Sequence, residues 1–303
     1  MRTSRFQHSL NILLADDGSP HSQAAIRMLC DLPLPTETRI TALTVFTPLQ
    51  SSDHARFRQT LETTRACLQE KGLNASTELQ LGYPAEKIIE LAEQLHPDLI
   101  VIGAKGLRAT LGILLGGVAQ QVVEYADWPV LIVRAPYKPI QRILCATDGS
   151  EYSQRALEYL VDFPFPDQSE MHLIHVMPPA PEPYPLIQTW PPAPEIVQPA
   201  PFLRPEEIDN ILAEQDLRGT ELIQRITGAL GETGNPVHSR LARGDAATEI
   251  IGYVKENGID LVVVGSRGLS QVKSWLLGSV SRKIIHYSDC TVLVVKSGES
   301  RHL

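Results

Sequence analysis

The feature of this sequence that most restricts its fold is a long internal repeat. The segment NILLADDGSPHSQAAI at residues 11–26 returns as RILCATDGSEYSQRAL at residues 142–157, an offset of 131 residues. Further along, PDLIVIGAKGL at residues 97–107 matches IDLVVVGSRGL at residues 259–269, an offset of 162 residues. A repeat of about 140 residues is too long for a solenoid unit and has the length of a domain. The sequence therefore predicts two tandem domains of the same fold.

The two domains are expected at residues 1–137 and 138–303. Because the second offset is larger by 31 residues, the second domain carries an insertion between Met177 and Gly244. Its most unusual part is residues 178–205, which contain eleven prolines. Proline lacks a backbone N–H and favours polyproline II, so we expect an arm without regular helix or strand. We expect this arm to pack on its own domain or on a partner subunit.

Short apolar runs alternate with amphipathic helical patterns in both repeats. Strands that are apolar on both faces and separated by helices indicate a parallel sheet with helices on both faces. The sequence thus predicts an α/β protein with two tandem doubly wound domains, each a five-stranded parallel sheet. For each sheet we take the strand order 3-2-1-4-5, in which the loops after the first and fourth strands flank the point where strand order reverses. The strands are expected near residues 11–16, 39–46, 75–81, 99–103 and 130–134, then 142–147, 170–176, 237–243, 261–265 and 291–296. The helices are expected near residues 21–31, 55–71, 84–95 and 117–126, then 152–162, 206–230, 246–257 and 279–287.

Each repeat ends in an apolar strand, Val130–Val133 or Val292–Val295, that forms a sheet edge in this strand order. An exposed apolar edge invites pairing with another strand. We therefore expect the two edges to pair antiparallel about a pseudo-two-fold axis, with residues 135–141 as the connection.

Composition limits the function classes. The formal net charge is −8, so a nucleic acid is not expected as a partner. No apolar run is long enough to span a membrane, and the N-terminal residues lack the pattern of a secretory signal. Four cysteines stand apart without a C-x-x-C pair, which fits buried thiols in a reducing compartment better than disulfides or a zinc site. These features favour a cytoplasmic protein.

The stretch with the strongest chemical signal follows the fourth strand of the second repeat. The apolar run ends in Gly265, Gly268 follows after two residues, and Gly278-Ser279 follow after nine more, where an amphipathic helix begins. Glycines let a backbone approach an anion closely. The N–H groups at the start of a helix, together with the hydroxyls of Ser279 and Ser281, supply donors. This arrangement predicts a phosphate site, although it matches neither the P-loop nor the dinucleotide-binding motif.

The spacing Gly-x2-Gly-x9-Gly-Ser resembles the ATP-binding signature of the universal stress protein family. The resemblance covers both repeats, including the D-G-S turn after the first strand, the valine that ends the second strand and the terminal PVLIV or TVLVV strand. It implies the same α/β fold, ATP (or AMP or ADP) as ligand, and magnesium held by the phosphates. It also implies a stress-response regulatory role through nucleotide-dependent conformation or assembly, a homodimer of tandem chains, and an unidentified protein partner.

The two expected nucleotide sites differ. In the second domain the site residues are Asp148, Val176, Gly265, Arg267, Gly268, Gly278, Ser279, Val280 and Ser281. In the first domain they are Asp17, Val45, Gly103, Lys105, Gly106, Gly116 and Gly117. Because Gly117 and Ala119 replace the two serines, the first site lacks two potential side-chain donors. A hydrogen bond to a charged acceptor contributes about 1.5–3 kcal/mol, so we expect the first site to bind roughly tenfold or more weakly.

Simpler interpretations stay open for several of these residues. Asp17 and Asp148 also fit a turn and cap before a helix, where D-G-S is common. Lys105 and Arg267 either neutralise phosphate or are solvated loop charges. Asp16 has Thr147 at the equivalent position, and we expect no role for it.

No catalytic constellation is evident in the sequence, which shows no nucleophile elbow, no metal-ligand cluster and no paired carboxylates. Three functions therefore remain. The protein is a nucleotide-binding regulator, which we favour, a slow ATPase or phosphotransferase using the same pocket, or an interaction scaffold whose sites bind no nucleotide.

Overall fold

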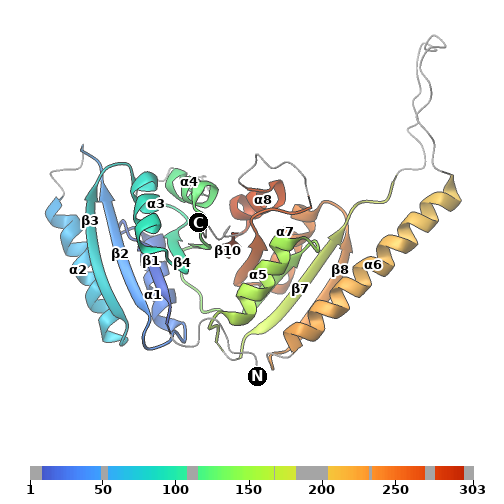
Figure 1. Cartoon of the computed structure of the whole chain (residues 1–303), viewed down its shortest axis with the longest axis horizontal. Coiled ribbons are helices and arrows are strands. Elements are labelled where there is room, and N and C mark those ends of the chain that lie inside the picture. Colours follow the sequence, from blue (N-terminus) through green and yellow to red (C-terminus); the bar gives the residue numbers. More distant parts are fainter. Residues whose placement is uncertain are drawn as a thin grey trace, which may run out of the picture.

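The computed structural model describes residues 9–48, 54–107, 115–166, 168–181, 204–231, 234–269 and 277–296. Strands and helices alternate along the chain (Figure 1). The first half contains β1 (Asn11–Ala15), α1 (Pro20–Asp31), β2 (Arg39–Phe46), α2 (His54–Glu70), β3 (Asn74–Leu81), α3 (Pro84–Leu95), β4 (Leu99–Gly103), α4 (Gly117–Tyr125) and β5 (Val130–Val133). The second half contains β6 (Arg142–Thr147), α5 (Glu151–Asp162), β7 (Glu170–Met177), α6 (Pro205–Gly231), β8 (Val237–Arg243), α7 (Ala246–Asn257), β9 (Leu261–Gly265), α8 (Ser279–Tyr287) and β10 (Thr291–Val295).

The strands of both halves form one continuous sheet. Among the described residues it has ten strands in the order β3-β2-β1-β4-β5-β10-β9-β6-β7-β8. Each half therefore has the predicted order 3-2-1-4-5, and all neighbours within a half are parallel. The prediction of two tandem doubly wound units is confirmed.

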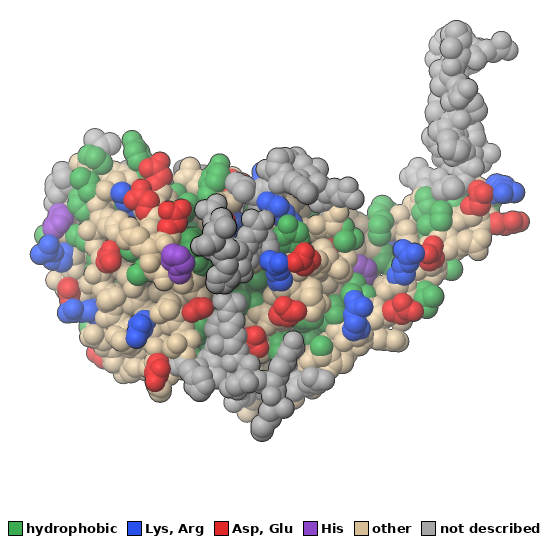
Figure 2. Space-filling view, viewed as in Figure 1, with side chains coloured by type: hydrophobic (Ala, Val, Ile, Leu, Met, Phe, Trp, Pro, Cys, Tyr) green, Lys and Arg blue, Asp and Glu red, His purple; other side chains and the backbone are tan. Residues whose placement is uncertain are grey.

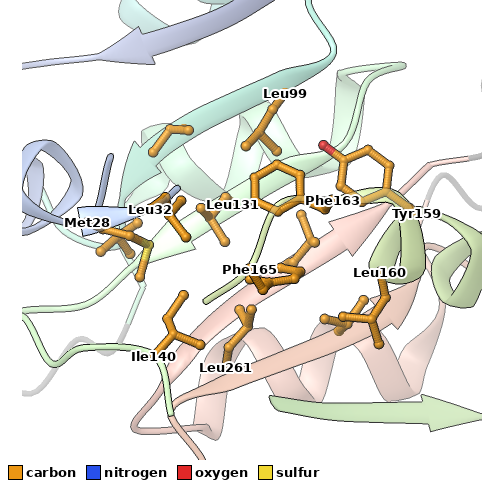
Figure 3. Packing of buried hydrophobic residues seen from close by; sticks show 14 of the residues in the cluster. Met28, Leu32, Leu99, Leu131, Ile140, Tyr159, Leu160, Phe163, Phe165 and Leu261 are labelled. Atoms are coloured by element: carbon orange, nitrogen blue, oxygen red, sulfur yellow. The ribbon is translucent and has the colours of Figure 1, made fainter. Parts of the chain in front are cut away.

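The pleat of the sheet divides its apolar side chains between two cores. In β1, Ile12 and Leu14 enter one core, whereas Leu13 and Ala15 enter the other. Helices α1, α2, α5 and α6 cover the first face, and α3, α4, α7 and α8 cover the second. Each core takes residues from both halves, as the aromatic cluster around Phe163 shows beside Leu99 and Leu131 (Figure 3). The two halves are therefore packed as one body.

The halves meet where β5 and β10 pair antiparallel, as predicted from their apolar edges. The register joins Ile132 to Val292, Leu131 to Leu293 and Val130 to Val294. Leu131 and Leu293 are equivalent at the offset of 162 residues, so the pseudo-two-fold axis passes through this pair.

Two basic residues that follow these strands fasten the junction. Arg134 donates from Nε to the carbonyl of Cys290 (3.1 Å) and from Nη2 to that of Ile285 in α8 (2.5 Å). Its equivalent, Lys296, donates from Nζ to the carbonyl of Glu124 in α4 (3.4 Å). Positive charge at a helix C-terminus is favoured by the helix dipole. Burial lowers the pKa of both cations, that of Lys296 to about 8.

The proline-rich arm predicted at residues 178–205 lies almost wholly outside the described residues. Helix α6 begins at its end, with Glu206 and Glu207 in the first turn. Acidic and basic side chains are interspersed over the visible face of α6 (Figure 2), with ion pairs such as Arg218–Glu214. Within the described ranges, none of the helices combines the length and apolar character that a membrane span requires.

Candidate functional site

Each half has a crevice at the carboxyl ends of its strands, where strand order reverses between β1 and β4 or between β6 and β9. The first crevice has a volume of about 300 Å³ and the second about 210 Å³. Both lie where doubly wound sheets usually bind ligands. All the predicted site residues of the first domain line its crevice, and so do all those of the second domain.

The aspartate after the first strand of each half holds the glycine loop in place. In the second half, Asp148 accepts the N–H of Ser150 on Oδ1 (2.9 Å) and that of Leu269 on Oδ2 (3.0 Å). The helix cap is Ser150, whose side chain accepts the N–H of Ser153 (3.2 Å). The first half repeats these contacts with Asp17, Ser19, Ser22 and Leu107. The aspartate thus begins the turn, as the simpler interpretation stated, but it is not the cap.

Packing explains why two positions of the glycine motif carry no side chain. A Cβ on Gly265 would lie 2.7 Å from the backbone of Tyr152 in α5, and one on Gly103 would lie 2.8 Å from the backbone of α1. A Cβ on Gly268 would lie 2.4 Å from Oδ2 of Asp148. These glycines therefore permit close packing of a helix and of a carboxylate. The sequence reasoning did not foresee this packing reason, and the approach of an anion to these glycines stays a prediction.

The start of α8 presents the donors expected for an anion. Gly278 precedes the helix and donates its N–H to the carbonyl of Ser266 (2.8 Å). The next N–H groups have no acceptor within a helix, which is the general condition of a helix N-terminus. Ser279 is exposed at this point, whereas Ser281 is buried and donates to the carbonyl of Gly265 (2.8 Å). Only Ser279 therefore keeps a hydroxyl proton for a ligand, so the first domain lacks one such donor rather than the two predicted.

The valines that end β2 and β7 offer backbone groups to the crevices. Strand β1 pairs with β2 only as far as Ala15 and Leu43, and the carbonyl of Leu43 accepts the N–H of Asp16 (2.9 Å). Two residues later, Val45 directs its N–H and C=O toward the same side, where β1 has already ended. Val176 occupies the equivalent place, one residue beyond the last pair of β6 with β7.

The basic residues of the two glycine loops differ in their surroundings. The guanidinium of Arg267 lies over the ring of Tyr152, 5.7 Å from its centroid, and donates to its hydroxyl (3.3 Å). The guanidinium of Arg267 therefore packs on Tyr152. It is neither freely solvated nor held at the start of α8. The backbone carbonyl of Lys105 accepts the hydroxyl of Ser19 (3.1 Å), which ties this loop to α1.

Asp16 has a role that the sequence reasoning missed. It is 2% exposed, accepts the N–H of Gly18 on Oδ1 (2.9 Å), and accepts the hydroxyl of Thr64 in α2 on Oδ2 (2.6 Å). Our expectation of no role was therefore wrong. An acid directly after an apolar strand is a signal of such a buried contact, but its partner is 48 residues away.

Metal ligands do not gather in the part of the chain that the structure describes. No group of three His, Cys, Asp or Glu side chains there could hold a metal ion.

These features define a tandem, doubly wound α/β protein with a candidate anion-binding crevice in each half. The model of the "Universal stress protein family" matches residues 9–134 and again residues 139–296. The chain therefore belongs to the universal stress protein family and contains two of its domains.

Similar proteins agree with this assignment. "Universal stress protein YxiE" of Bacillus subtilis is 34% identical over 155 residues, covering 51% of this chain and 98% of the relative. A "Universal stress protein" of Mycolicibacterium smegmatis is 25% identical over 308 residues, covering 94% of this chain and 96% of the relative. The crystal structure of a universal stress protein from Archaeoglobus fulgidus superposes with a TM-score of 0.66 at 23% identity, covering 97% of this chain and 98% of that one. The last comparison shows a shared fold across both domains.

Proposed function

We propose that this protein is an adenine-nucleotide-binding regulator whose second domain binds ATP, or AMP or ADP, more tightly than its first. The observation that carries the proposal is the combination within the second crevice of a helix start bearing Ser279 and an unpaired backbone edge at Val176. One end of the crevice suits phosphate and the other suits a base.

The base end is argued from backbone hydrogen bonding. Adenine presents an acceptor ring nitrogen beside a donor amino group. The N–H and C=O of Val176 point to one side of the strand, so they match that pair without any side chain. Val45 offers the same groups in the first domain.

The phosphate end is argued from electrostatics. The N–H groups at the start of α8 and the positive end of its dipole favour an anion, and the Ser279 hydroxyl adds one donor. Magnesium would be held by the phosphates rather than by the protein. The acid lining this crevice, Asp148, already accepts backbone N–H groups on both oxygens.

The hydrogen bonds of Asp148 also favour a regulator over a hydrolase. Because both oxygens of Asp148 are used to hold the loop, this carboxylate is poorly suited to take a proton from an attacking water. Nucleotide occupancy would then act through conformation or assembly. Homodimer formation and binding of a protein partner stay predictions.

The test uses a matched pair of variants, Val280→Glu and Val118→Glu. Each valine lies in the first turn of its helix and lines its crevice, and they are equivalent at the offset of 162 residues. A carboxylate there repels phosphate but is favourable at a helix N-terminus. Because both valines are half-buried against the core, the melting temperature of each variant is measured beside its affinity. Calorimetry with ATP and magnesium should show the tighter site lost in Val280→Glu and kept in Val118→Glu.

Two results would overturn the proposal. Unchanged tight binding in Val280→Glu would show that the nucleotide lies elsewhere. If wild-type protein released no nucleotide on denaturation, gave no heat with ATP and did not change its melting temperature, the scaffold without nucleotide would be the better description.

A further inference from the structure

A cluster of titratable side chains lies at the amino ends of β6, β7 and β8. His172 in β7 and His238 in β8 are directly paired in the sheet, and their ring centroids are 5.0 Å apart. Helix α7 packs on this face and places the hydroxyl of Tyr253 2.8 Å from Nδ1 of His172. The cluster borders a cavity of about 640 Å³. Because the nucleotide crevice lies at the carboxyl ends of the strands, this cluster is separate from it.

His172 is a buried group whose second ring nitrogen has no hydrogen bond. The residue is 6% exposed, and within the part of the chain that the structure describes its Nε2 has no hydrogen-bond partner. Oε2 of Glu170 lies 3.7 Å from this nitrogen and already accepts the Nε–H of Arg142 (3.1 Å). A buried polar atom without a partner is rare in a native fold and calls for an explanation.

The surroundings of His172 hold its ring neutral. Burial is the main cause that lowers its pKa, and the neighbouring His238 lowers it further. Glu170 acts in the opposite direction, and Arg142 adds to the lowering. The other charged groups around the cavity come from β8 and α7, and they are Arg240, Lys255 and Glu256. Arg240 is paired with Glu256 (3.1 Å), so neither is free to compensate a charge on the ring.

We propose that His172 is an acid-sensitive contact, which holds α7 on the sheet of the second domain while its ring is neutral and releases the helix when the ring takes a proton. The burial of the ring, its contact with His238 and its hydrogen bond with Tyr253 of α7 carry this assignment.

Release follows from the solvation of the charged ring. A buried imidazolium lacks water around it and lies against a second histidine, so it is more stable once α7 has moved away. Ala246 and Ile250 of α7 line the second crevice. Acid would therefore loosen one wall of that crevice, whatever ligand the crevice takes.

The direction of the pH effect follows from the two states of this contact. When α7 is released, the ring of His172 is solvated and its pKa returns to the ordinary value of 6.5, whereas the packed ring has a lower pKa. Between these two pH values the released state binds more protons, so acid favours release. Above pH 6.5 the ring is neutral in both states and the contact has its full strength. One proton changes the opening equilibrium by at most about tenfold per pH unit.

The first domain has the equivalent contact without histidine or tyrosine. Thr41 and Ser76 occupy the places of the two histidines, and their hydroxyl oxygens are 3.3 Å apart. Leu91 of α3 occupies the place of the tyrosine and is buried in the same core. Helix α3 is therefore an internal reference for α7 at every pH.

The experiment follows His172 and α7 in the full-length protein without nucleotide, from about pH 8 to pH 5. NMR of the histidine rings should show His172 titrating below 6.5. Hydrogen exchange, corrected for the intrinsic rate at each pH, should show protection of α7 falling below pH 6.5 while α3 keeps its protection. A pKa of His172 at or above 6.5, or an equal response of α7 and α3, would overturn the proposal.

Two single variants should move the titration of His172 in opposite directions. His238→Ser copies Ser76 and removes a neighbour that lowers the pKa, so His172 should titrate at a higher pH. Glu170→Gln removes the neighbour that raises the pKa, so His172 should titrate at a lower pH. A merely structural effect would not produce this pair of shifts. Shifts in one direction only, or none, would refute the electrostatic assignment.

The matched control copies the first domain at all three positions, as His172→Thr/His238→Ser/Tyr253→Leu. Its strands keep a polar pair and its helix keeps an apolar contact, so α7 should follow α3 at every pH. An acid response of α7 that persists in this variant would place the sensor elsewhere and overturn the proposal. If the triple variant is unstable, the wild-type titration and the two single variants still decide.

Discussion

The two domains of this protein share a topology but differ in the side chains that line the crevice and in those that meet a second helix. Both keep the aspartate that holds the glycine loop and the serine that caps the first helix. At the helix start in the crevice, however, Gly117 in the first domain faces open space, whereas Ser279 in the second adds a hydroxyl. The first crevice is also larger, at about 300 Å³ against about 210 Å³. Positions required by packing are thus the same, and positions that face the crevice differ.

A second difference lies in the contact between the helices of one sheet face. In the first domain it includes the hydrogen bond that the Thr64 hydroxyl donates to Asp16. In the second domain Thr147 replaces Asp16 and donates instead to Ser153 (3.0 Å). Leu222 stands against Gly149 where the first domain has Thr60 against Gly18. The first domain therefore places polar side chains at a helix contact where the second has an apolar one.

The largest effect is expected at the junction, which joins both halves equally. Ile132 and Val294 are equivalent and 0% exposed, so Ile132→Lys or Val294→Lys would bury an unpaired charge at a cost of several kcal/mol, about 4 or more. We expect the halves to separate or unfold, as measured by melting and small-angle scattering. Tyr125→Lys, at an exposed helix end, is the control and should behave as wild type. Unchanged melting and compactness in both core variants would refute the shared junction.

The next effect tests whether the glycines after β4 and β9 serve packing in both domains. Gly103→Ala and Gly265→Ala should each cost about 1–3 kcal/mol, because the new Cβ meets helix backbone at 2.8 or 2.7 Å. Gly117→Ala meets nothing within 4 Å and should leave stability unchanged or slightly higher. Urea unfolding measures all three. An effect in only one domain would show that the two packings are not equivalent.

An exchange at the crevices tests the difference in their donors. Ser279→Gly should weaken ATP binding to the second domain about tenfold, and Gly117→Ser should strengthen the first by a similar factor. The control is Ser281→Ala, whose hydroxyl donates to the Gly265 carbonyl and should affect stability more than affinity. If the exchange changes neither affinity in calorimetry, the hydroxyl is not what distinguishes the sites.

The smallest effect is the pH dependence of stability that Lys296 contributes at the junction of the two halves. Because the pKa of Lys296 falls from 10.5 to about 8 on folding, the unfolded chain binds the extra proton between those pH values. Stability should therefore rise with pH from about 8 to 10.5, with a contribution of about 1 kcal/mol after solvent screening. Lys296→Arg copies Arg134 of the first half and should remove this rise. A wild-type and a variant curve of unfolding free energy that stay parallel would contradict the assignment.

Much of the fold was predictable because it depends on local patterns. Apolar runs of strand length between helical periods predicted a parallel sheet with helices on both faces, and the apolar edges of β5 and β10 predicted their antiparallel pairing. The crevice residues were also predictable as a group, because the carboxyl ends of parallel strands meet at one edge of a sheet. The individual roles of Ser281, Gly268 and Asp16 were not, since each depends on which atom faces it.

The sequence by itself determined that this chain is a duplicated, doubly wound α/β protein, because periodicity and repetition are properties of neighbouring residues. Only the tertiary structure decided that Asp148 holds Leu269, that Arg134 reaches the end of α8, and that Thr64 reaches Asp16. Such contacts join residues that lie 48 to 151 positions apart in the sequence. Their proximity depends on how the helices pack on the sheet. It cannot be inferred from the spacing of residues along the chain.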